Sequence, residues 1–486
     1  MFMPTGKFLL LVMPPQEGLL NGFAAGLISL ANYIRHHQPE VSVEIADYSY
    51  LTTEEAESAL TRRLRCVVDL TVFVGITSTT ASYQSALKIA AYAKGASTSV
   101  VTIMGGHHVS ADAETVLRAH ARWVDIIVIG EGERTLSEVI QTYPLVESVR
   151  GLAFFRGGIF LKTEPATPLE QAELDNLSVF YGDKGVIGTP GKLGHVTYVS
   201  ARGCPLKCSF CAVGNERIRA KSVQRVRGDI EHLIQLGYRR ISIEDNFFAH
   251  SPRRTREICD ELAALKRAYP DFSWDCQTRV EAVARPNTIE LLSAAGCEAT
   301  FIGVETVVHA QLYYLNKTHD PHKYLKTLRE WVVPNLMKTT IGCYINLQFG
   351  LPRETAQDAE VTIEYLESLG QIAAAANKKV TVFPQLHVVY PGTPHFRQGV
   401  QEGAFPGDVF ESFTEWEASE KPIRFWLGEH FAHGTGGLPV GIMQADRLRK
   451  RQYFVEPGAV ARISTVLRKI SRIPGIEVFQ YGAELV

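Results

Sequence analysis

The sequence predicts an α/β fold made of two successive β/α units: a doubly wound parallel sheet, then a partial barrel of six β/α repeats, with a mainly helical C-terminal segment. The first observation is a regular alternation of apolar, strand-like runs with amphipathic, helix-like runs. The second is that strand-like runs such as Leu9–Val12 are continuously apolar, because strands of a parallel sheet are covered on both faces. The third is a break in this alternation at 146–194, which divides the 486 residues into two units.

The first unit, residues 1–145, is expected to hold five parallel strands with helices between them. The strands are expected at Lys7–Met13, Val41–Ala46, Leu70–Ile76, Val100–Met104 and Ile126–Ile129. The helices are expected at Ala24–Arg35, Thr53–Leu64, Tyr83–Lys94, Ala111–Ala121 and Arg134–Tyr143. Ligands of such sheets bind beyond the carboxyl ends of the strands, so the loops that follow the strands form a candidate site.

Residues 146–194 are expected to form a linker that contains a hairpin with an Arg-Gly-Gly turn. The barrel is expected over 195–400, where helix-length stretches separate the candidate strands. These strands are His195–Ser200, Arg240–Ile243, Phe272–Gln277, Ala299–Val304, Ile341–Phe349 and Val380–Val389. Residues 401–486 lose the β/α rhythm and form either a cap that selects the substrate or an aromatic-rich helical cover outside the barrel. Their aromatic and histidine residues include Phe405, Phe410, Phe413, Trp416, Phe425, Trp426, His430, Phe431 and His433.

Composition and charge narrow the function. The chain is 45% hydrophobic and 21% charged, as in globular proteins, and its formal net charge of −2 gives no basic field that favours nucleic acid. A small molecule or a peptide is the expected substrate. Since no apolar run reaches about 18 residues and the N-terminus lacks signal-peptide features, we expect a cytoplasmic protein without a membrane span. Five scattered further cysteines fit a reducing compartment.

Three cysteines, Cys204, Cys208 and Cys211, lie in the loop after the first barrel strand. Because [4Fe–4S] clusters usually take four thiolates, a set of three leaves one iron able to bind and reduce a substrate. Two alternatives stay open: a zinc site, with His195 or His232 as a fourth ligand, and a disulfide, which leaves one thiol over. Barrel active sites lie at the C-terminal ends of the strands, and the loop has this position, so the cluster is favoured.

The segment Arg202–Cys211 resembles the radical S-adenosylmethionine (SAM) family in its Cys-x3-Cys-x2-Cys spacing and in Phe210 before the last cysteine. The resemblance implies that the cysteines ligate a [4Fe–4S] cluster and that the methionyl amine and carboxylate of SAM chelate the open iron. An electron from the cluster would then split SAM into methionine and a 5′-deoxyadenosyl radical. It also implies an external electron donor of the flavodoxin or ferredoxin type.

The strand-end loops of the first unit extend the resemblance. Met13–Pro15, 105–111 and 125–136 are similar to the cobalamin-binding domain that precedes the barrel in one radical SAM subfamily. Together with the strand-end loop that contains Thr77 and Ser78, these stretches give the residues expected at cobalamin: Thr77, Ser78, Gly105, Gly106, His107, Gly130 and Glu131. The Asp-x-His-x-x-Gly motif that supplies a cobalt ligand in other cobalamin proteins is absent, so the lower face of cobalt stays unassigned. We expect His107 and His108 to cap a helix or touch a ligand edge rather than bind a metal.

Acidic residues at barrel strand ends are expected to hold SAM. Glu244, Asp245 and Asn246 follow the second strand and suit the methionyl ammonium or the ribose hydroxyls. Asp245 and Asn246 are similar to the family's Asp-Asp/Asn-Phe stretch. Gly303-Val-Glu305 matches the family's Gly-x-Glu position, where the carboxylate contacts SAM. The alternative for these acids is an ordinary solvated strand end.

Three other residues carry the resemblance along the barrel. Arg279 ends the third strand, where family members often have an arginine for the SAM carboxylate or ribose. Gln348 and Pro391 lie in stretches that resemble the fifth- and sixth-strand loops of the adenine pocket. Cys276 and Cys343 lie on barrel strands, where either is a candidate hydrogen-atom donor or, more commonly for free cysteine, a packed core residue.

Three hypotheses for the function follow. The favoured one is a cobalamin-dependent radical SAM methyltransferase, which methylates a carbon that is not nucleophilic. The second is a cyclase or rearrangement enzyme with the same cofactors but without methyl transfer. The third, from another class, is a cobalamin- or metal-binding regulator whose cysteines hold zinc.

Overall fold

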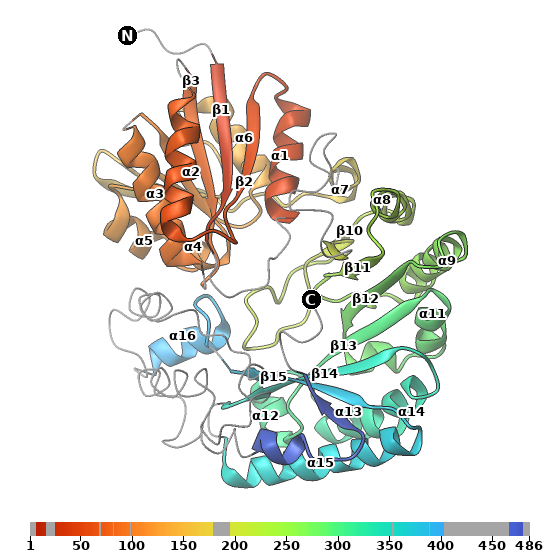
Figure 1. Ribbon diagram of the computed structural model, residues 1–486. Helices are drawn as coiled ribbons and strands as arrows, with labels where there is room; N and C mark the ends of the chain where they lie inside the picture. The colour runs from red at the N-terminus through yellow and green to blue at the C-terminus, as the bar shows by residue number, and fades with distance from the viewer. Residues whose placement is uncertain are drawn as a thin grey trace. The chain divides into compact units, whose positions relative to one another are not determined.

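The computed structural model describes residues 6–15, 25–67, 70–80, 82–97, 99–177, 195–351, 354–387, 389–402 and 466–479, which form two compact units (Figure 1). Among the described residues, the first unit comprises those up to 177 together with Tyr390–Gly392. The second comprises those from His195 to Val389, those from Thr393 to 402, and 466–479.

The first unit is a seven-stranded sheet in the order β2-β1-β3-β4-β5-β6-β7. Its first five strands are parallel and confirm the predicted ones: β1 Gly6–Met13, β2 Ser42–Asp47, β3 Leu70–Thr77, β4 Val101–Gly105 and β5 Ile126–Val128. The strand order reverses between β1 and β3. Ligands of doubly wound sheets bind at such a reversal, outside the carboxyl ends of the strands.

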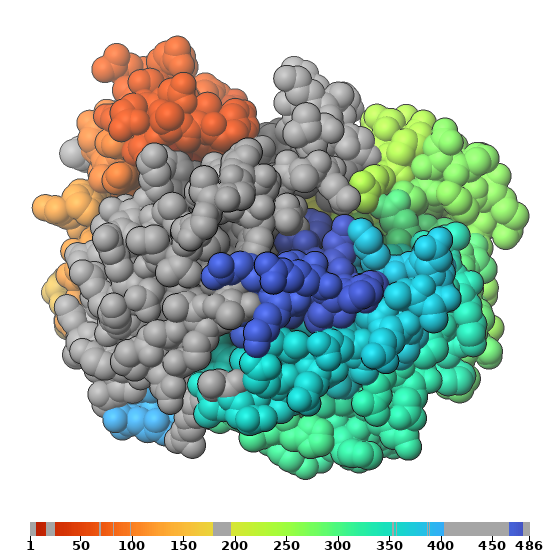
Figure 2. Space-filling view, turned by 60° about the horizontal axis from the view of Figure 1, so that its bottom comes forward, coloured from red at the N-terminus to blue at the C-terminus, as the bar shows by residue number. Residues whose placement is uncertain are grey.

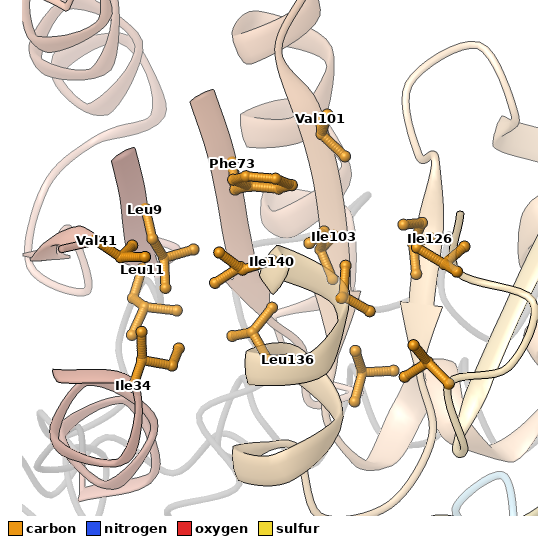
Figure 3. Close-up of a cluster of buried hydrophobic side chains, with 14 of the residues drawn as sticks. Leu9, Leu11, Ile34, Val41, Phe73, Val101, Ile103, Ile126, Leu136 and Ile140 are labelled. Atoms are coloured by element: carbon orange, nitrogen blue, oxygen red, sulfur yellow. The ribbon is translucent and has the colours of Figure 1, made fainter. Parts of the chain in front are cut away.

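Helices cover both faces of this sheet, as predicted. They are α1 Ala25–His37, α2 Thr53–Arg65, α3 Tyr83–Ala96, α4 His107–Ala111, α5 Ala113–His120 and α6 Glu133–Thr142. On one face, Ile34 of α1 and Leu136 and Ile140 of α6 pack against apolar strand residues such as Leu11 (Figure 3). The helix predicted over Ala111–Ala121 is confirmed as α5, whose start is fixed by the side chain of Asp112, which accepts a hydrogen bond from Thr115 N. The short helix α4 before it was not predicted.

The hairpin predicted within the linker is part of the first sheet, so the linker prediction is wrong at this point. Strands β6 Leu152–Arg156 and β7 Ile159–Lys162 pair antiparallel, and β6 also pairs antiparallel with β5. Leu152 and Phe154 of β6 belong to the same apolar core as β1 and β3. A short helix, α7 Gln171–Asn176, follows. Residues 178–194 of the predicted linker lie outside the described residues.

The second unit is a parallel seven-stranded sheet whose order, β16-β15-β14-β13-β12-β11-β8, follows the chain from one edge to the other. The six predicted strands are confirmed as β8 His195–Tyr198, β11 Arg240–Ile243, β12 Ser273–Thr278, β13 Cys297–Glu305, β14 Gly342–Phe349 and β15 Val380–Leu386. Helices separate them, the longest being α8 Val223–Gln235, α9 Pro252–Ala268 and α15 Ala356–Ala375. Such a one-directional strand order is that of a β/α barrel.

The sequence did not predict β16 Ile476–Val478, which adds a parallel strand beside β15. Figure 2 shows residues 466–479 in dark blue beside the light-blue part of the second unit. The described segment 466–479 thus contributes a strand to the barrel sheet. The aromatic residues at 405–433 lie outside the described residues.

No helix within the described ranges combines the length and the hydropathy that crossing a bilayer requires.

Candidate active site

The cysteine loop begins and ends in a short antiparallel ladder. Strands β9 Ala201–Arg202 and β10 Arg219–Ala220 pair across it, and Glu216 N donates to Cys204 O at 2.8 Å. Gly203 has a φ of +85°, and a Cβ there would collide with Arg217 O, so the Arg-Gly-Cys turn requires glycine. The backbone therefore closes the loop before any ligand binds.

The three thiols of this loop share one electrostatic environment. Cys204 and Cys208 are buried and Cys211 is half-buried. Burial raises the pKa of Cys204, while the positive charges of Arg279 and Lys317 lower it. Burial also raises the pKa of Cys211, and the neighbouring Cys208 and Cys204 raise it further. Since thiolates are the metal-binding form, cations beside the loop favour ligation.

Arg279 brings a positive charge to the cysteines rather than standing alone at a strand end. It is 9% exposed, and its Nη1 lies 3.5 Å from Cys208 Sγ. Its Nη2 donates to the carbonyl oxygen of Lys317 and lies 3.3 Å from Glu281 Oε1. The guanidinium is thereby fixed next to a cysteine sulfur, where it offsets the negative charge of a thiolate ligand.

Glu305, the predicted SAM-contact acid, is held by two donors. Lys317 Nζ lies 3.0 Å from Oε1, and Gln348 Nε2 lies 2.7 Å from Oε2. Lys317 is 6% exposed and Glu305 7% exposed, so the ion pair is buried and each charge needs the other. No sequence signal pointed to Lys317, since it lies beyond a short helix rather than at a strand end.

The backbone around Glu305 explains the Gly-x-Glu pattern. Glu305 has a φ of +72°, which is a strained conformation for a residue with a side chain, and the pairing of β13 with β14 shifts register between Gly303 and Glu305. A Cβ at position 303 would lie 2.7 Å from Glu305 Oε1 and 3.0 Å from Lys317 Nζ. Glycine at 303 thus leaves room for the carboxylate to turn back toward Lys317.

A second acidic group lies on the inner face of the barrel. The Ser242 hydroxyl donates to Asp275 Oδ1 and lies 3.1 Å from Glu244 Oε1, while Gln277 Nε2 lies 2.5 Å from Glu244 Oε2. Burial raises the pKa of Asp275 to about 6 and also raises the pKa of Glu244. Sequence reasoning found Glu244 but missed Asp275, because Asp275 lies inside a strand instead of at its end.

The other two residues predicted with Glu244 lie apart from this group. Asp245 is 1% exposed, and its carboxylate accepts from Ser200 N at 2.6 Å, from Ser200 Oγ at 2.5 Å and from Ala201 N at 2.9 Å. It therefore fixes the chain at the entry to the cysteine loop. Asn246 is exposed.

Of the remaining predicted barrel residues, two lie with the site residues described above and one does not. Gln348 contacts Glu305, as described, and Phe210 is half-buried in the cysteine loop. Pro391 is buried and groups with the first unit, together with its neighbours Tyr390 and Gly392, so it is not placed with Gln348.

The two barrel cysteines that were candidate hydrogen-atom donors are packed in the core. Cys276 is fully buried, and a side-chain hydrogen bond with Cys297 is the largest factor that raises its pKa. Its strand neighbour Trp274 donates through Nε1 to Ala295 O beside α11 Thr288–Ala294, so this side of β12 faces the helices. Cys343 is also buried, and burial raises the pKa of its thiol to about 12.

In the first unit, the strand ends form a ledge of backbone and small side chains. Ser78 N donates to Gly105 O at 2.7 Å, which joins the ends of β3 and β4. Gly106 has a φ of +109°, and a Cβ there would collide with Ser78 O. Gly130 also has a positive φ, with open space where its Cβ would be. A backbone that approaches this closely suits a bulky ligand bound largely by shape.

The polar side chains of this ledge have distinct positions. Thr77 is half-buried and His107 is exposed at the start of α4. His108 is buried against Tyr83 at 4.4 Å between ring centroids, with its Nδ1 3.1 Å from Thr80 Oγ1. Burial lowers the pKa of His108 to about 3. Glu131 Oε2 accepts from Leu169 N at 3.1 Å.

Across the described part of the chain, no three His, Cys, Asp or Glu side chains converge in the manner of a single-ion site, and this holds for the cysteine loop too. Each thiolate ligand of a four-iron cluster binds a different iron atom, so such ligands need not meet at one point.

Comparisons with known proteins match both units. The family model of the B12 binding domain matches residues 20–140, and that of the radical SAM superfamily matches residues 198–366. An uncharacterized methyltransferase of Pyrococcus horikoshii, PH0819, is 27% identical over 379 residues, or 74% of this chain and 78% of the relative. An anaerobic magnesium-protoporphyrin IX monomethyl ester cyclase of Cereibacter sphaeroides is 27% identical over 54% of this chain and 43% of its own.

The fold is shared with a solved structure. The radical SAM methyltransferase TsrM from Kitasatospora setae, solved with cobalamin and a [4Fe–4S] cluster bound, superimposes with a TM-score of 0.70 at 17% identity. The match covers 99% of this chain and 92% of that one.

The chain therefore carries a B12 binding domain followed by a radical SAM domain, and this order of domains is the predicted one. Its cofactors are SAM and a [4Fe–4S] cluster in the second domain and cobalamin in the first. The residues fit these groups: three thiols beside a buried guanidinium suit an iron–sulfur cluster, and a glycine ledge at the carboxyl ends of parallel strands suits cobalamin.

Proposed function

We propose that this chain transfers a methyl group from SAM to a carbon that has no nucleophilic lone pair, in a small-molecule or peptide substrate. The observation that carries the proposal is one chain with both a cobalamin-type ledge and a three-cysteine loop beside Arg279 and Glu305. A nucleophilic heteroatom could be methylated by SAM directly, so the two cofactors together are needed only for a less reactive centre. In this chemistry the cluster supplies the electron that splits SAM, and cobalamin carries the methyl group.

In this proposal one group of barrel residues ligates the cluster and another contacts SAM. Cys204, Cys208 and Cys211 ligate the cluster, with Arg279 beside Cys208. Glu305, fixed by Lys317 and Gln348, receives the SAM molecule that the cluster reduces. A radical this reactive has to form against its target and away from water, which rigid, buried partners favour.

The acidic group on the inner face of the barrel is proposed to bind an ammonium or hydroxyl group of the nucleoside or of the substrate. Glu244 and Asp275 share the Ser242 hydroxyl, so a cationic or hydroxyl group that enters would find two carboxyls close together. In the first unit, Ser78, Gly105, Gly106, His107 and Gly130 are proposed to line cobalamin. The electron donor is proposed to be a flavodoxin or a ferredoxin, and the location the cytoplasm.

The test is the product pair. Reduced, reconstituted protein incubated with SAM should form S-adenosylhomocysteine, the product of methyl donation, and 5′-deoxyadenosine, the product of reductive cleavage. When cobalamin is omitted, the first product should disappear and the second should remain. Formation of 5′-deoxyadenosine alone in the complete mixture would contradict methyl transfer.

A second candidate is the cyclase or rearrangement reaction with the same cofactors. It is favoured by the 27% identity with the magnesium-protoporphyrin IX monomethyl ester cyclase. Since this chain spans less than half of that relative, the match is a weaker argument than the match to the methyltransferase, which extends over 78% of the relative. The same product assay separates the two, because this second reaction yields no S-adenosylhomocysteine.

A further inference from the structure

Two buried histidines, His387 and His395, have no part in the function described so far. His387 follows β15 and is 4% exposed, and His395 lies in α16 Pro394–Gln401 and is 2% exposed. His387 Nδ1 lies 2.7 Å from Gln348 Oε1, and its Nε2 lies 3.4 Å from His395 Nδ1. A polar chain thus runs from Glu305 through Gln348 to both rings.

The chemistry of Glu305 sets the direction of these hydrogen bonds. A carboxylate only accepts, so the atom of Gln348 that faces Glu305 at 2.7 Å is the amide nitrogen. The amide oxygen then faces His387, and His387 Nδ1 must donate to it. In the neutral form of His387, Nε2 accepts from His395 Nδ1. Each donor in the chain therefore points toward Glu305.

The far end of the chain is anchored on the cysteine loop. The ring of His395 stacks on Tyr314 at 4.6 Å, and its backbone N donates to Ser209 O at 3.0 Å. Ser209, the residue after Cys208, donates through Oγ to Tyr314 O at 3.0 Å. From Cys208 the contacts continue through Arg279 and Lys317 back to Glu305. The network is a closed ring around the cysteine loop and Glu305.

We propose that His387 is a positioning residue for Glu305, and that the His387–His395 pair couples the Glu305 carboxylate to the cysteine loop. The proposal rests on the role of Glu305 at SAM proposed above. Without the His387 donor, the Gln348 amide is free to rotate and present its oxygen to Glu305, which replaces an attraction with a repulsion. Neighbouring hydrogen bonds in a buried chain polarise one another. A cationic group that binds at Glu305 therefore changes the hydrogen bonds along the whole network.

The test compares two substitutions at one position. His387→Ala removes the donor to Gln348, whereas His387→Asn places an amide N–H where Nδ1–H was. On protein with a fully reconstituted cluster, we expect His387→Ala to weaken SAM binding about tenfold, as for the loss of one buried hydrogen bond. His387→Asn should bind SAM within about threefold of the wild type. Iron content should be the same in both.

A spectroscopic readout tests the coupling. The electron paramagnetic resonance signal of the reduced cluster should respond to SAM in the wild type. His395→Phe keeps a ring to stack on Tyr314 but has no nitrogen for His387. This variant should bind SAM about threefold more weakly and give an altered signal with SAM bound.

Tyr365→Phe is the matched control. It removes another partly buried hydrogen bond of the same unit, Tyr365 Oη to Leu325 O at 2.7 Å, and should change neither SAM binding nor the signal. An equal loss of SAM affinity in this control would overturn the proposal, since a general loosening of the barrel would then explain it.

The outcomes separate this proposal from the one on which it rests. If Glu305→Gln weakens SAM binding and His387→Ala leaves it within twofold of the wild type, His387 is not a positioning residue. If Glu305→Gln itself leaves SAM binding unchanged, the role proposed for Glu305 is wrong. Should His387→Ala fail to assemble a cluster, the Asn and His395→Phe variants decide the question by the same affinities and signals.

Discussion

The candidate ligand sites of the two units lie at the same kind of sheet edge, but they differ in the chemical groups that form them. Both sites lie at the carboxyl ends of parallel strands. The first unit offers backbone and small residues, with Gly106 against Ser78. The second offers buried charges, with Arg279 against Cys208 and Lys317 against Glu305. The contrast suggests that a large cofactor is held mainly by shape, whereas a small zwitterion beside iron is held by fixed charges.

The largest effect should come from the cysteine loop. Cys204→Ser replaces a buried sulfur next to Cys208 with a poor iron ligand, so the reconstituted protein should lose most of its iron, sulfide and visible cluster absorption. Cobalamin content should stay close to that of the wild type, because the first unit is unchanged. Cys66→Ser, which alters an exposed thiol of the first unit, is the control and should retain the cluster. Full iron content in Cys204→Ser would contradict the role of Cys204 as a cluster ligand.

The next largest effect concerns the buried ion pair of Glu305 and Lys317 in the second unit. Gly303→Ala puts a methyl group 2.7 Å from Glu305 Oε1 and 3.0 Å from Lys317 Nζ, so the ion pair must move. We expect SAM affinity to fall about tenfold to a hundredfold, in line with an overpacking cost of roughly 1–3 kcal/mol, with the cluster intact. Equilibrium binding of SAM to the reconstituted protein measures this.

Gly228→Ala is the control for Gly303→Ala. Position 228 lies within α8, and a Cβ there meets no atom within 4 Å. This substitution should leave SAM binding unchanged and stabilise the helix slightly, because alanine is the better helix former. Unchanged SAM binding in Gly303→Ala would show that the room around Glu305 is not needed.

A substitution at Gly106 tests whether the first unit binds its ligand mainly by shape. Its φ of +109° and the collision of an added Cβ with Ser78 O mean that Gly106→Ala strains the ledge. We expect the free energy of unfolding of the first unit to fall by about 2–3 kcal/mol and cobalamin retention to drop, while the cluster of the second unit still assembles. Gly95→Ala in α3, where an added Cβ meets no atom within 4 Å, should leave both unchanged. Retained cobalamin in Gly106→Ala would contradict a ledge that binds by close approach.

The smallest effect concerns the pH dependence of stability. Burial raises the pKa of Asp275 from 3.8 to about 6, so the folded protein binds this proton more tightly than the unfolded chain does. The corresponding stability is fully present below about pH 4 and is lost as the pH rises through 6. At pH 8 the buried carboxylate therefore costs about 1–3 kcal/mol, and Asp275→Asn should raise the free energy of unfolding by that amount.

Denaturant unfolding at pH 8 and at pH 5.5 measures the effect of Asp275→Asn, which should be smaller at the lower pH. Asp271→Asn is the control, because Asp271 is exposed in the loop before the same strand. A variant at 275 that is less stable than the wild type at pH 8 would contradict a penalty from the buried charge.

The sequence predicted the strands and most helices of both units, and it singled out Glu305 and Gln348, which the structure brings into contact. Strands such as β1 and β14 were found because continuous apolar runs in a β/α alternation have few alternative structures. The glycines at 106 and 303 were found through loop position and resemblance, and the contacts that a Cβ would make explain why glycine is required at both positions.

The sequence missed features that depend on contacts far apart in the chain. Strand β16 is only three residues long and pairs with a strand about a hundred residues earlier, so no local pattern marks it. Asp275 lies within a predicted strand, and only the contacts of Ser242 with Asp275 and Glu244 mark it as part of an acidic group. Lys317, His387 and His395 acquire meaning only when the barrel brings them to Glu305 and Ser209.

The proposed function depends on a second unit that holds SAM against an iron–sulfur cluster ligated by three cysteines. The most direct measurement is the electron paramagnetic resonance spectrum of the anaerobically reconstituted and reduced protein, recorded with and without SAM. We predict the signal of a reduced [4Fe–4S] cluster whose shape and g values change when SAM is added. A colourless protein that holds zinc instead of iron, or a cluster signal that SAM leaves unchanged, would contradict the claim.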